Sequence, residues 1–234
     1  MSEVKKEWFY TMKKNLLIIL GLVVILGASS PLTVFASDCG QNLTGAESIN
    51  QSTFEEMINE IETIKSENPG LSEDEILKLM DDRHSSSPNE RGLIDIWNSL
   101  TDSEKKLCIR YPFDALKVNT ARNIATEQTE RKFGYSGLGD RSDAFRHGIW
   151  NAEMTVLIGK EKAELFATAH EDKDVTGDES DGYPKTAHRD MDLHNNEVGR
   201  AIGEQNKDVS EDEMADIIYQ DIFSGTTQFV WLHE

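Results

Sequence analysis

The residues whose types could carry out chemistry are concentrated in three short stretches of the C-terminal half. These stretches read DAFRHGIWN at residues 143–151, AHE at 169–171 and MDLHNNEVGR at 191–200. They supply histidine, carboxylate and amide side chains, which are the groups that bind divalent metals and transfer protons. The chemistry that this sequence can support therefore depends on whether the three stretches meet in space.

The first stretch predicts a helix with one enclosed polar edge. At about 3.6 residues per turn, Asp143, His147 and Asn151 lie along the same edge. The opposite edge is apolar, so that Arg146 and Glu153 are left as the solvent-facing side. Because enclosed polar groups cost free energy unless they are paired, we expect the Asp-His-Asn edge to meet partners from the other two stretches.

The third stretch predicts a helix over about residues 188–206. Asp192 and Asn195 lie on one polar edge of this helix, beside Gly199 and Gly203. Since glycine has no side chain, another backbone or a ligand can approach closely there. We predict that this edge packs face to face against the Asp-His-Asn edge of the first helix.

Two catalytic interpretations of these residues are open. A metal-assisted site would use His147, His170 and Asp192 as ligands of zinc or a similar divalent metal, completed by Asp143 or Glu171. Glu171 would then be the general base for a metal-bound water. A metal-free site would use His147 as the general base, with Asp143 orienting it. Neither HExxH nor HxH is present, so the spacing alone does not identify a metal.

A structural interpretation of the same residues is also open. Asp140 and Asp143 have the spacing of a helix N-cap and the third residue after it, where a carboxylate suits the helix dipole. The histidine, asparagine and Asp192 side chains would then form an internal hydrogen-bond network that fixes how two helices cross. The protein would in that case be a non-catalytic secreted binding or interaction module.

The three stretches resemble, in this order, the motifs of a helical domain family of unknown function. The family occurs in exported Gram-positive proteins and at the ends of large secreted, toxin-like proteins. Its pattern of LTxxEKxL…P…A, DAFRHxxWNA, AHE and MDxxNNxxGR is matched here from LTDSEKKLCIRYPFDAL at residues 100–116 to MDLHNNEVGR at 191–200. The resemblance covers roughly residues 98–205, implies a helical fold, and brings no established activity, substrate or cofactor.

The resemblance also marks individual positions of this chain. Its motifs emphasise Asp143, Arg146, His147, Asn151, His170, Glu171, Asp192, Asn195, Asn196 and Arg200. We expect the histidines and carboxylates among them to be catalytic. The expected substrate-binding residues are Arg146, Asn151, Asn195, Asn196 and Arg200. From export and the toxin-like relatives, the expected activity is that of a hydrolase acting on a phosphodiester or an envelope component.

The N-terminus has the pattern of a secretory signal. Lys13 and Lys14 precede an unbroken apolar run at residues 16–26, and small residues at the ends of Val34-Phe35-Ala36 suit a signal peptidase. We expect cleavage after Ala36, which makes the protein secreted or cell-surface. An uncleaved anchor is the alternative, because residues 15–37 carry no charge and could just span a bilayer. The membrane would then be contacted only through this segment.

Composition limits the partners of the chain. It has 43 acidic and 24 basic residues, for a formal net charge of −19. Such a surface repels polyanions at long range, so general binding to nucleic acid is not expected, although a local metal site can overcome the average field. Cys39 and Cys108 could form one disulfide outside the cell, or Cys108 could be a buried free thiol.

Helix signals dominate the organisation of the chain. Capping-box spacings occur at Ser52 and Glu55, Ser72 and Glu75, Thr101 and Glu104, and Ser210 and Glu213. Gly134 is placed to end a long helix, and residues 225–232 are the only strand-like stretch. The fold class predicted is all-α, an irregular multi-helix bundle with an N-terminal helical hairpin extension.

The predicted domains are a signal peptide at residues 1–36, a helical extension and linker at 37–88, and the functional helical domain at 89–234. An acidic loop at residues 172–183 lies inside this last domain. It matches positions 1, 3, 5 and 6 of a calcium-binding EF-hand loop but has Tyr183 where position 12 requires a bidentate glutamate. A solvated acidic loop is therefore the better interpretation.

Overall fold

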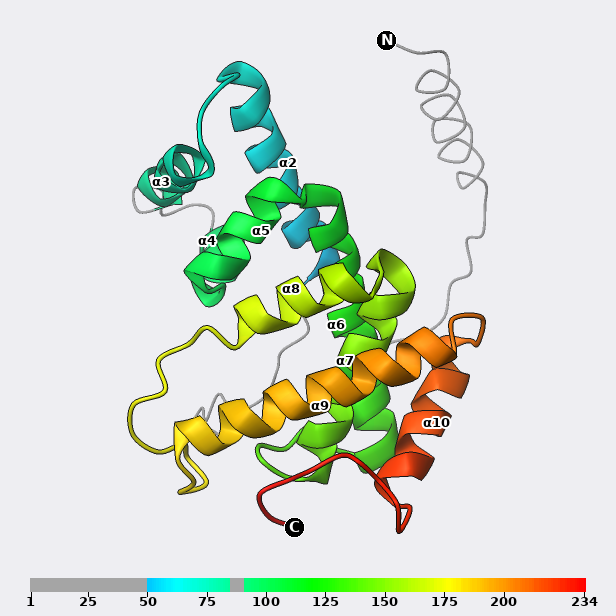
Figure 1. The fold of residues 1–234 in the computed structure, drawn as a ribbon. Helices are drawn as coiled ribbons and strands as arrows, with labels where there is room; N and C mark the ends of the chain where they lie inside the picture. Colours follow the sequence, from blue (N-terminus) through cyan, green and yellow to red (C-terminus); the bar gives the residue numbers. More distant parts are fainter. Residues whose placement is uncertain (1–49, 85–90) are drawn as a thin grey trace, which may run out of the picture. The chain divides into compact units, whose positions relative to one another are not determined.

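A computed structural model of the chain describes residues 50–84 and 91–234. Within these ranges the regular structure is helical, and the only β-type pairing is an isolated bridge between Asp178 and Pro184 (Figure 1). The helices are α2 (Gln51–Glu67), α3 (Glu73–His84), α4 (Arg91–Ser99), α5 (Asp102–Arg110), α6 (Pro112–Phe133), α7 (Arg141–Ile158), α8 (Lys160–His170), α9 (Lys185–Gln205) and α10 (Glu211–Ile222). The predicted all-α class is confirmed.

Most of the predicted helix ends are confirmed. Thr101 and Ser210 form capping boxes, and Ser72 exchanges the same pair of hydrogen bonds with Glu75. Gly134 ends α6 in the left-handed conformation, with φ of 77°. The capping box predicted at Ser52 is wrong, because Asn50 caps α2 by accepting hydrogen bonds from the two amides that follow Gln51.

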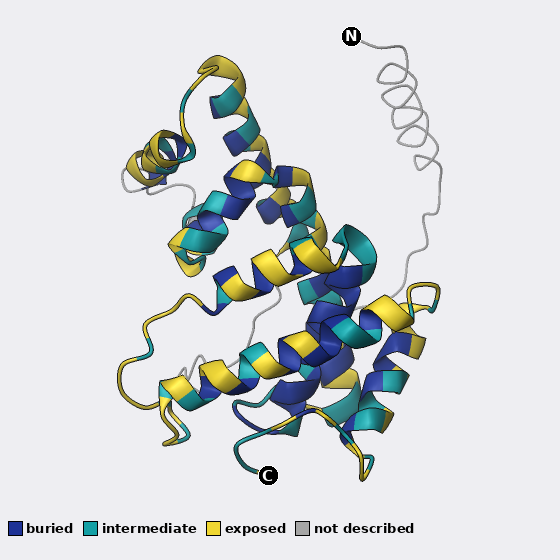
Figure 2. Cartoon of the chain, viewed as in Figure 1, coloured by how far each residue is buried: buried dark blue, intermediate teal, exposed yellow. Residues whose placement is uncertain are grey.

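Helix α7 is the most enclosed helix among the described residues (Figure 2). Helices α6, α8, α9 and α10 all pack against it. The Asp-His-Asn edge is buried, as predicted. The solvent-facing side predicted for the same helix is wrong, because Glu153 is 5% exposed and Arg146 is half-buried. Apolar periodicity within one helix does not reveal how many neighbours surround it.

The crossing of α7 and α9 depends on glycine, as the sequence indicated. A Cβ atom added to Gly199 would lie 2.3 Å from the carbonyl oxygen of Gly148, and one added to Gly203 would lie 2.5 Å from that of Ala152. The two backbones are therefore in direct contact, and no larger residue fits between them. This close approach brings the polar edges of the two helices together.

The N-terminal helices α2 and α3 pack against α4, α5 and α6. Their buried side chains, such as Ile61 and Met80, belong to one apolar cluster with Trp97 and Ile109. The linker predicted at Ser85 to Pro88 lies outside the described residues, so the domain boundary placed there stays a prediction.

The C-terminal tail is not a strand. Asn195 on α9 holds its backbone at Val230, donating to the carbonyl oxygen at 2.9 Å and accepting from the amide at 3.0 Å. The amide of Leu232 donates to the carbonyl oxygen of Gly139 at 2.7 Å. The prediction for residues 225–232 failed because the described part of the chain offers this segment no strand to pair with, and a side chain supplies the hydrogen bonds instead.

Several predictions fall on residues whose structure is not described. The signal peptide at residues 1–36 and Cys39 lie outside the described ranges. Within these ranges Cys108 has a free thiol whose pKa is raised by burial, which makes it unreactive. No helix of the described residues is both long and apolar enough to span a membrane.

Candidate functional site

The predicted face-to-face packing of α7 and α9 brings three potential metal ligands together. His147 Nε2 lies 3.3 Å from Asp192 Oδ1 and 3.6 Å from Asp143 Oδ1. One ligand atom from each residue lies within 4.8 Å of the other two. We call Asp143, His147 and Asp192 the front cluster.

Local sequence fixes the position of Asp143. Asp140 is the N-cap of α7, as predicted, and its side chain accepts hydrogen bonds from the amides of Ser142 and Asp143. Asp143 in turn accepts the amide of Gly139 at 2.7 Å and pairs with Arg146 one turn later. Burial alone would raise the pKa of Asp143, but Arg146, His147 and this amide together hold it below its usual value. Asp143 is therefore an anion in this site.

A second group of side chains lies behind the histidine ring. Asn196 Oδ1 is 3.1 Å from His147 Nδ1 and accepts a hydrogen bond from Asn151 at 2.6 Å, while its Nδ2 donates to Glu171 at 3.3 Å. Arg200 donates to Asn151 Oδ1 at 2.9 Å. We call Asn151, Glu171, Asn196 and Arg200 the rear network, and all four are buried.

The rear network determines the tautomer of His147. Asn196 Nδ2 donates to the carboxylate of Glu171, and Asn196 Oδ1 accepts from Asn151, so the orientation of this amide is fixed with its oxygen toward His147. An amide oxygen can only accept a hydrogen bond, so His147 Nδ1 must be the donor. Nδ1 therefore carries the proton, and the lone pair of Nε2 points at the two carboxylates. Burial and the neighbouring Arg146 lower the pKa of His147 to about 4, so the ring is neutral at pH 7.

When both aspartates are ionised, the front cluster has hydrogen-bond acceptors but no donors where its members meet. Asp192 Oδ1 is buried and has no hydrogen-bond partner among the described residues. Burial, together with the negative charges of Asp143 and Glu171, raises the pKa of Asp192 well above its usual value. Two carboxylates and a lone pair converge on one point, and either a proton or a cation is needed there to balance them.

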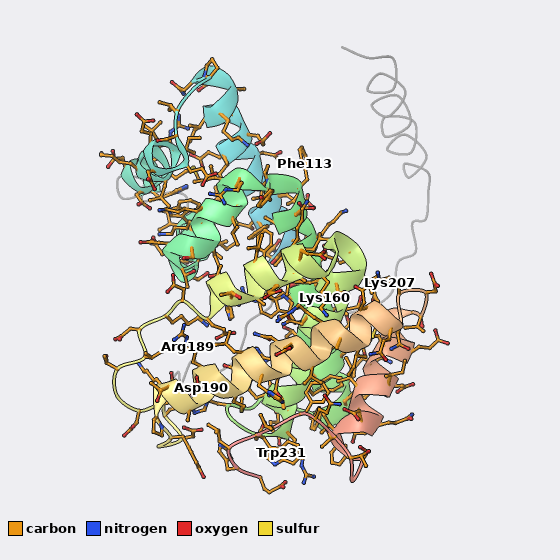
Figure 3. The ribbon with its side chains drawn as sticks, viewed as in Figure 1. Phe113, Lys160, Arg189, Asp190, Lys207 and Trp231 are labelled. Carbon is orange, nitrogen blue, oxygen red and sulfur yellow. The ribbon has the colours of Figure 1, made fainter. Side chains whose placement is uncertain are left out.

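The front cluster lies in the wall of a pocket of about 300 Å³. The loop between α8 and α9 forms part of this wall, so the pocket extends from the buried histidine to the surface. Basic side chains that the sequence did not single out also line it, namely Arg122, Lys173, Lys185 and Arg189. Arg189 lies near the N-terminal end of α9 (Figure 3). Nothing in the one-dimensional pattern distinguishes these residues from other surface cations.

Other predicted site residues lie in different surroundings. His170 lines the pocket but lies outside the front cluster. Both of its ring nitrogens are engaged, because Nδ1 lies 2.9 Å from a carboxylate oxygen of Glu104 and Nε2 lies 3.0 Å from Lys173 Nζ. Glu171 also lines the pocket, and its Oε1 lies 3.8 Å from His147 Nδ1, on the side of the ring away from the front cluster. Asn195 holds the C-terminal tail and lies outside the pocket lining.

The acidic loop does not gather its carboxylates into a calcium site. Asp172 accepts a hydrogen bond from Ser103 at 2.5 Å, whereas Asp174 accepts from Thr176 within the loop. In the described part of the chain, the front cluster is the only group of three or more metal-ligating side chains close enough to share an ion. The solvated interpretation of this loop agrees with the geometry.

Comparison with known proteins identifies a family and nothing beyond it. The family described as "Domain of unknown function (DUF6973)" matches residues 105–226, slightly more than half of the chain. The match includes α6 to α10 and every residue of the front cluster and the rear network. No curated protein and no solved structure matches the chain.

Proposed function

The chain belongs to the DUF6973 family, whose description names no activity, and we propose that it is a divalent-metal-dependent hydrolase. The observation that carries the proposal is the convergence of His147 Nε2 with oxygens of Asp143 and Asp192, within 4.8 Å of one another, in the wall of a pocket. Three protein ligands and an open side are the arrangement of catalytic zinc sites.

The chemistry of the donor set fits a metal. A histidine that binds a metal must be neutral, and its other ring nitrogen usually donates to a fixed acceptor. His147 meets both conditions, through its lowered pKa and its contact with Asn196. A cation would also relieve the repulsion between Asp143 and Asp192, which a proton now relieves only by neutralising one of them.

The same values argue against a metal-free mechanism. A general base works best when its pKa lies near the operating pH. With a pKa of about 4, His147 is a weak base at neutral pH, so orientation by Asp143 would give little catalysis. A metal at the front cluster would instead supply the nucleophile by lowering the pKa of a bound water.

The structural interpretation applies to the rear network. Its side chains are mutually hydrogen-bonded, and Asn151, Asn196 and Arg200 lie outside the pocket lining. We therefore assign these three residues to helix crossing and histidine orientation, and not to substrate binding. A secreted binding module without catalysis would need only this rear layer.

Export belongs to the proposal as well. The basic and apolar pattern of residues 13–26, followed by small residues up to Ala36, supports secretion or display at the cell surface. A family found in exported Gram-positive and toxin-like proteins would agree with this location. Protein recovered from culture medium with Ser37 as its first residue would support it, and membrane-retained protein with an intact N-terminus would contradict it.

Metal titration of the purified protein tests the proposed function. After chelator treatment, zinc should bind with a stoichiometry near one and raise the unfolding free energy by about 2.7 kcal/mol at a hundredfold excess over Kd. Asp192→Asn should lose this stabilisation. Asp190→Asn is the matched control, because Asp190 is exposed on the same helix and outside the pocket lining (Figure 3). Equal zinc binding by wild type and Asp192→Asn would refute the assignment.

A further inference from the structure

Arg122 lies on α6, where the pocket of the front cluster adjoins a second, mainly apolar cavity. That cavity has a volume of about 60 Å³ and is lined by side chains such as Val118, Ala125 and Phe166. Arg122, Arg146 and His170 line both spaces. The guanidinium of Arg122 therefore has apolar surroundings on one side and the pocket of the front cluster on the other.

The guanidinium of Arg122 forms no ion pair or hydrogen bond with any residue in the described ranges. Five other arginines of the described chain have carboxylate partners: Arg83 with Glu60, Arg110 with Glu73, Arg131 with Asp212, Arg141 with Glu234, and Arg146 with Asp143. Arg189, which lines the same pocket, and Arg200 form no ion pair among the described residues. A half-buried cation without a counter-ion carries a desolvation cost, so its position in a pocket points to an anion that comes from outside.

The neighbours of Arg122 do not supply that anion. Burial lowers the pKa of Arg122, Glu104 opposes this effect, and Arg146 adds to it. Both carboxylate oxygens of Glu104 are already engaged, one by His170 at 2.9 Å and the other by the amide of Thr101 at 2.8 Å. Glu104 thus offsets the charge of Arg146 through space, but it forms no hydrogen bond with Arg122.

Arg146 has an unused donor in the same place. One of its terminal nitrogens pairs with Asp143, but its Nε is buried and has no hydrogen-bond partner among the described residues. Arg122 and Arg146 thus both line the pocket beside the front cluster, although the Nε of Arg146 itself is enclosed. Two guanidinium groups close together repel each other unless an anion bridges them.

We propose that Arg122 and Arg146 bind the phosphoryl group of a small phosphate ester, next to the metal at the front cluster. As an assignment of substrate class, this rests on the proposed hydrolase function. Guanidinium groups match phosphoryl oxygens through paired hydrogen bonds, and a metal held by Asp143, His147 and Asp192 would polarise a remaining oxygen of the same group. A phosphoryl group has enough oxygens to contact two arginines and a metal at once. The net charge of −19 disfavours long polyanions, which points to a small ester.

Calorimetric titration with inorganic phosphate and methyl phosphate tests this inference on metal-free protein. Removing a charge-assisted hydrogen bond costs about 1.5–3 kcal/mol, so Arg122→Gln should weaken binding of both probes roughly 10- to 100-fold. Arg131→Gln is the matched control, because it removes the same charge from α6 at a residue that lines neither space. It should leave both dissociation constants unchanged.

Several results would overturn the inference. These are no binding of either probe to wild-type protein, equal affinity in Arg122→Gln and wild type, or equal weakening in the Arg131→Gln control. Arg122→Lys guards against misfolding, since it keeps the charge and loses the paired geometry. It should bind the probes with intermediate affinity. Because an unpaired buried charge is removed, Arg122→Gln should unfold at a temperature no lower than wild type in the absence of phosphate.

Failure of this inference can be distinguished from failure of the metal assignment. Zinc titration of Arg122→Gln should give the wild-type stoichiometry, because Arg122 is not a ligand. If Arg122→Gln retains zinc binding and its phosphate affinity is unchanged, only the assignment of the phosphoryl site is refuted. If wild-type protein binds phosphate but no zinc, only the metal assignment is refuted.

Discussion

The two sides of the His147 ring differ in how completely their polar groups are paired. On the Nδ1 side, the rear network joins Asn151, Glu171 and Asn196 through hydrogen bonds. On the Nε2 side, carboxylates face a lone pair, and Asp192 Oδ1 has no hydrogen-bond partner among the described residues. A paired interior network stabilises a fold, whereas an unpaired buried acceptor next to a pocket indicates a ligand. The same sequence motifs thus supply both a structural layer and a candidate site.

The largest effect is expected from breaking the rear network. Asn196→Ala removes the partner of His147 Nδ1, Asn151 and Glu171 at once and leaves buried groups unpaired. It should lower the unfolding free energy by about 3 kcal/mol, as measured by urea denaturation of metal-free protein. A loss below about 0.5 kcal/mol would show that this network is not structural.

Removing a carboxylate from the front cluster should have the opposite sign. Asp192→Asn relieves the repulsion from Asp143 and Glu171, and so should raise the unfolding free energy of metal-free protein at pH 8 by about 1 kcal/mol. With zinc present the order should reverse, because only wild-type protein gains binding energy. If Asp192→Asn instead destabilised the metal-free protein, Asp192 would have a structural role like that of the rear network.

An effect of similar size, but independent of zinc, is expected at Glu153, a buried carboxylate outside the site. Burial and the nearby Glu211 raise the pKa of Glu153 to about 7. Since the folded-state pKa exceeds the unfolded value, the charged form destabilises the fold, and the penalty grows as pH rises from about 4.5 to 7. Glu153→Gln should match wild-type stability at pH 4 and exceed it by roughly 1 kcal/mol at pH 8, with or without zinc. Equal stability of the two proteins at pH 8 would contradict the buried charge.

The sequence predicted those parts of the fold that depend on local pattern. The enclosed Asp143-His147-Asn151 edge follows from helical periodicity, the N-cap at Asp140 from local spacing, and the backbone contact at Gly199 from the absence of a side chain. Each of these features can be predicted from the sequence of a single helix and the pattern of its polar edge.

Features that depend on which elements become neighbours were missed. Glu153 is buried because α10 and α6 also pack on α7, and Asn195 pairs with a tail 35 residues away. Arg122 is notable because of the partner it lacks, which only the assembled pocket reveals. His170 faces inward as predicted but is taken up by Glu104, a residue that the sequence singled out only as a helix cap.

The most direct test of the central claim is anomalous diffraction from crystals of the protein grown with zinc. The account predicts one strong peak at the front cluster, about 2.0–2.2 Å from His147 Nε2 and from an oxygen of both Asp143 and Asp192. Asn196 should remain on Nδ1, with the rear network unchanged. Crystals that bind zinc elsewhere, or that show a proton-sharing contact between Asp192 and His147 without a peak between them, would contradict the account.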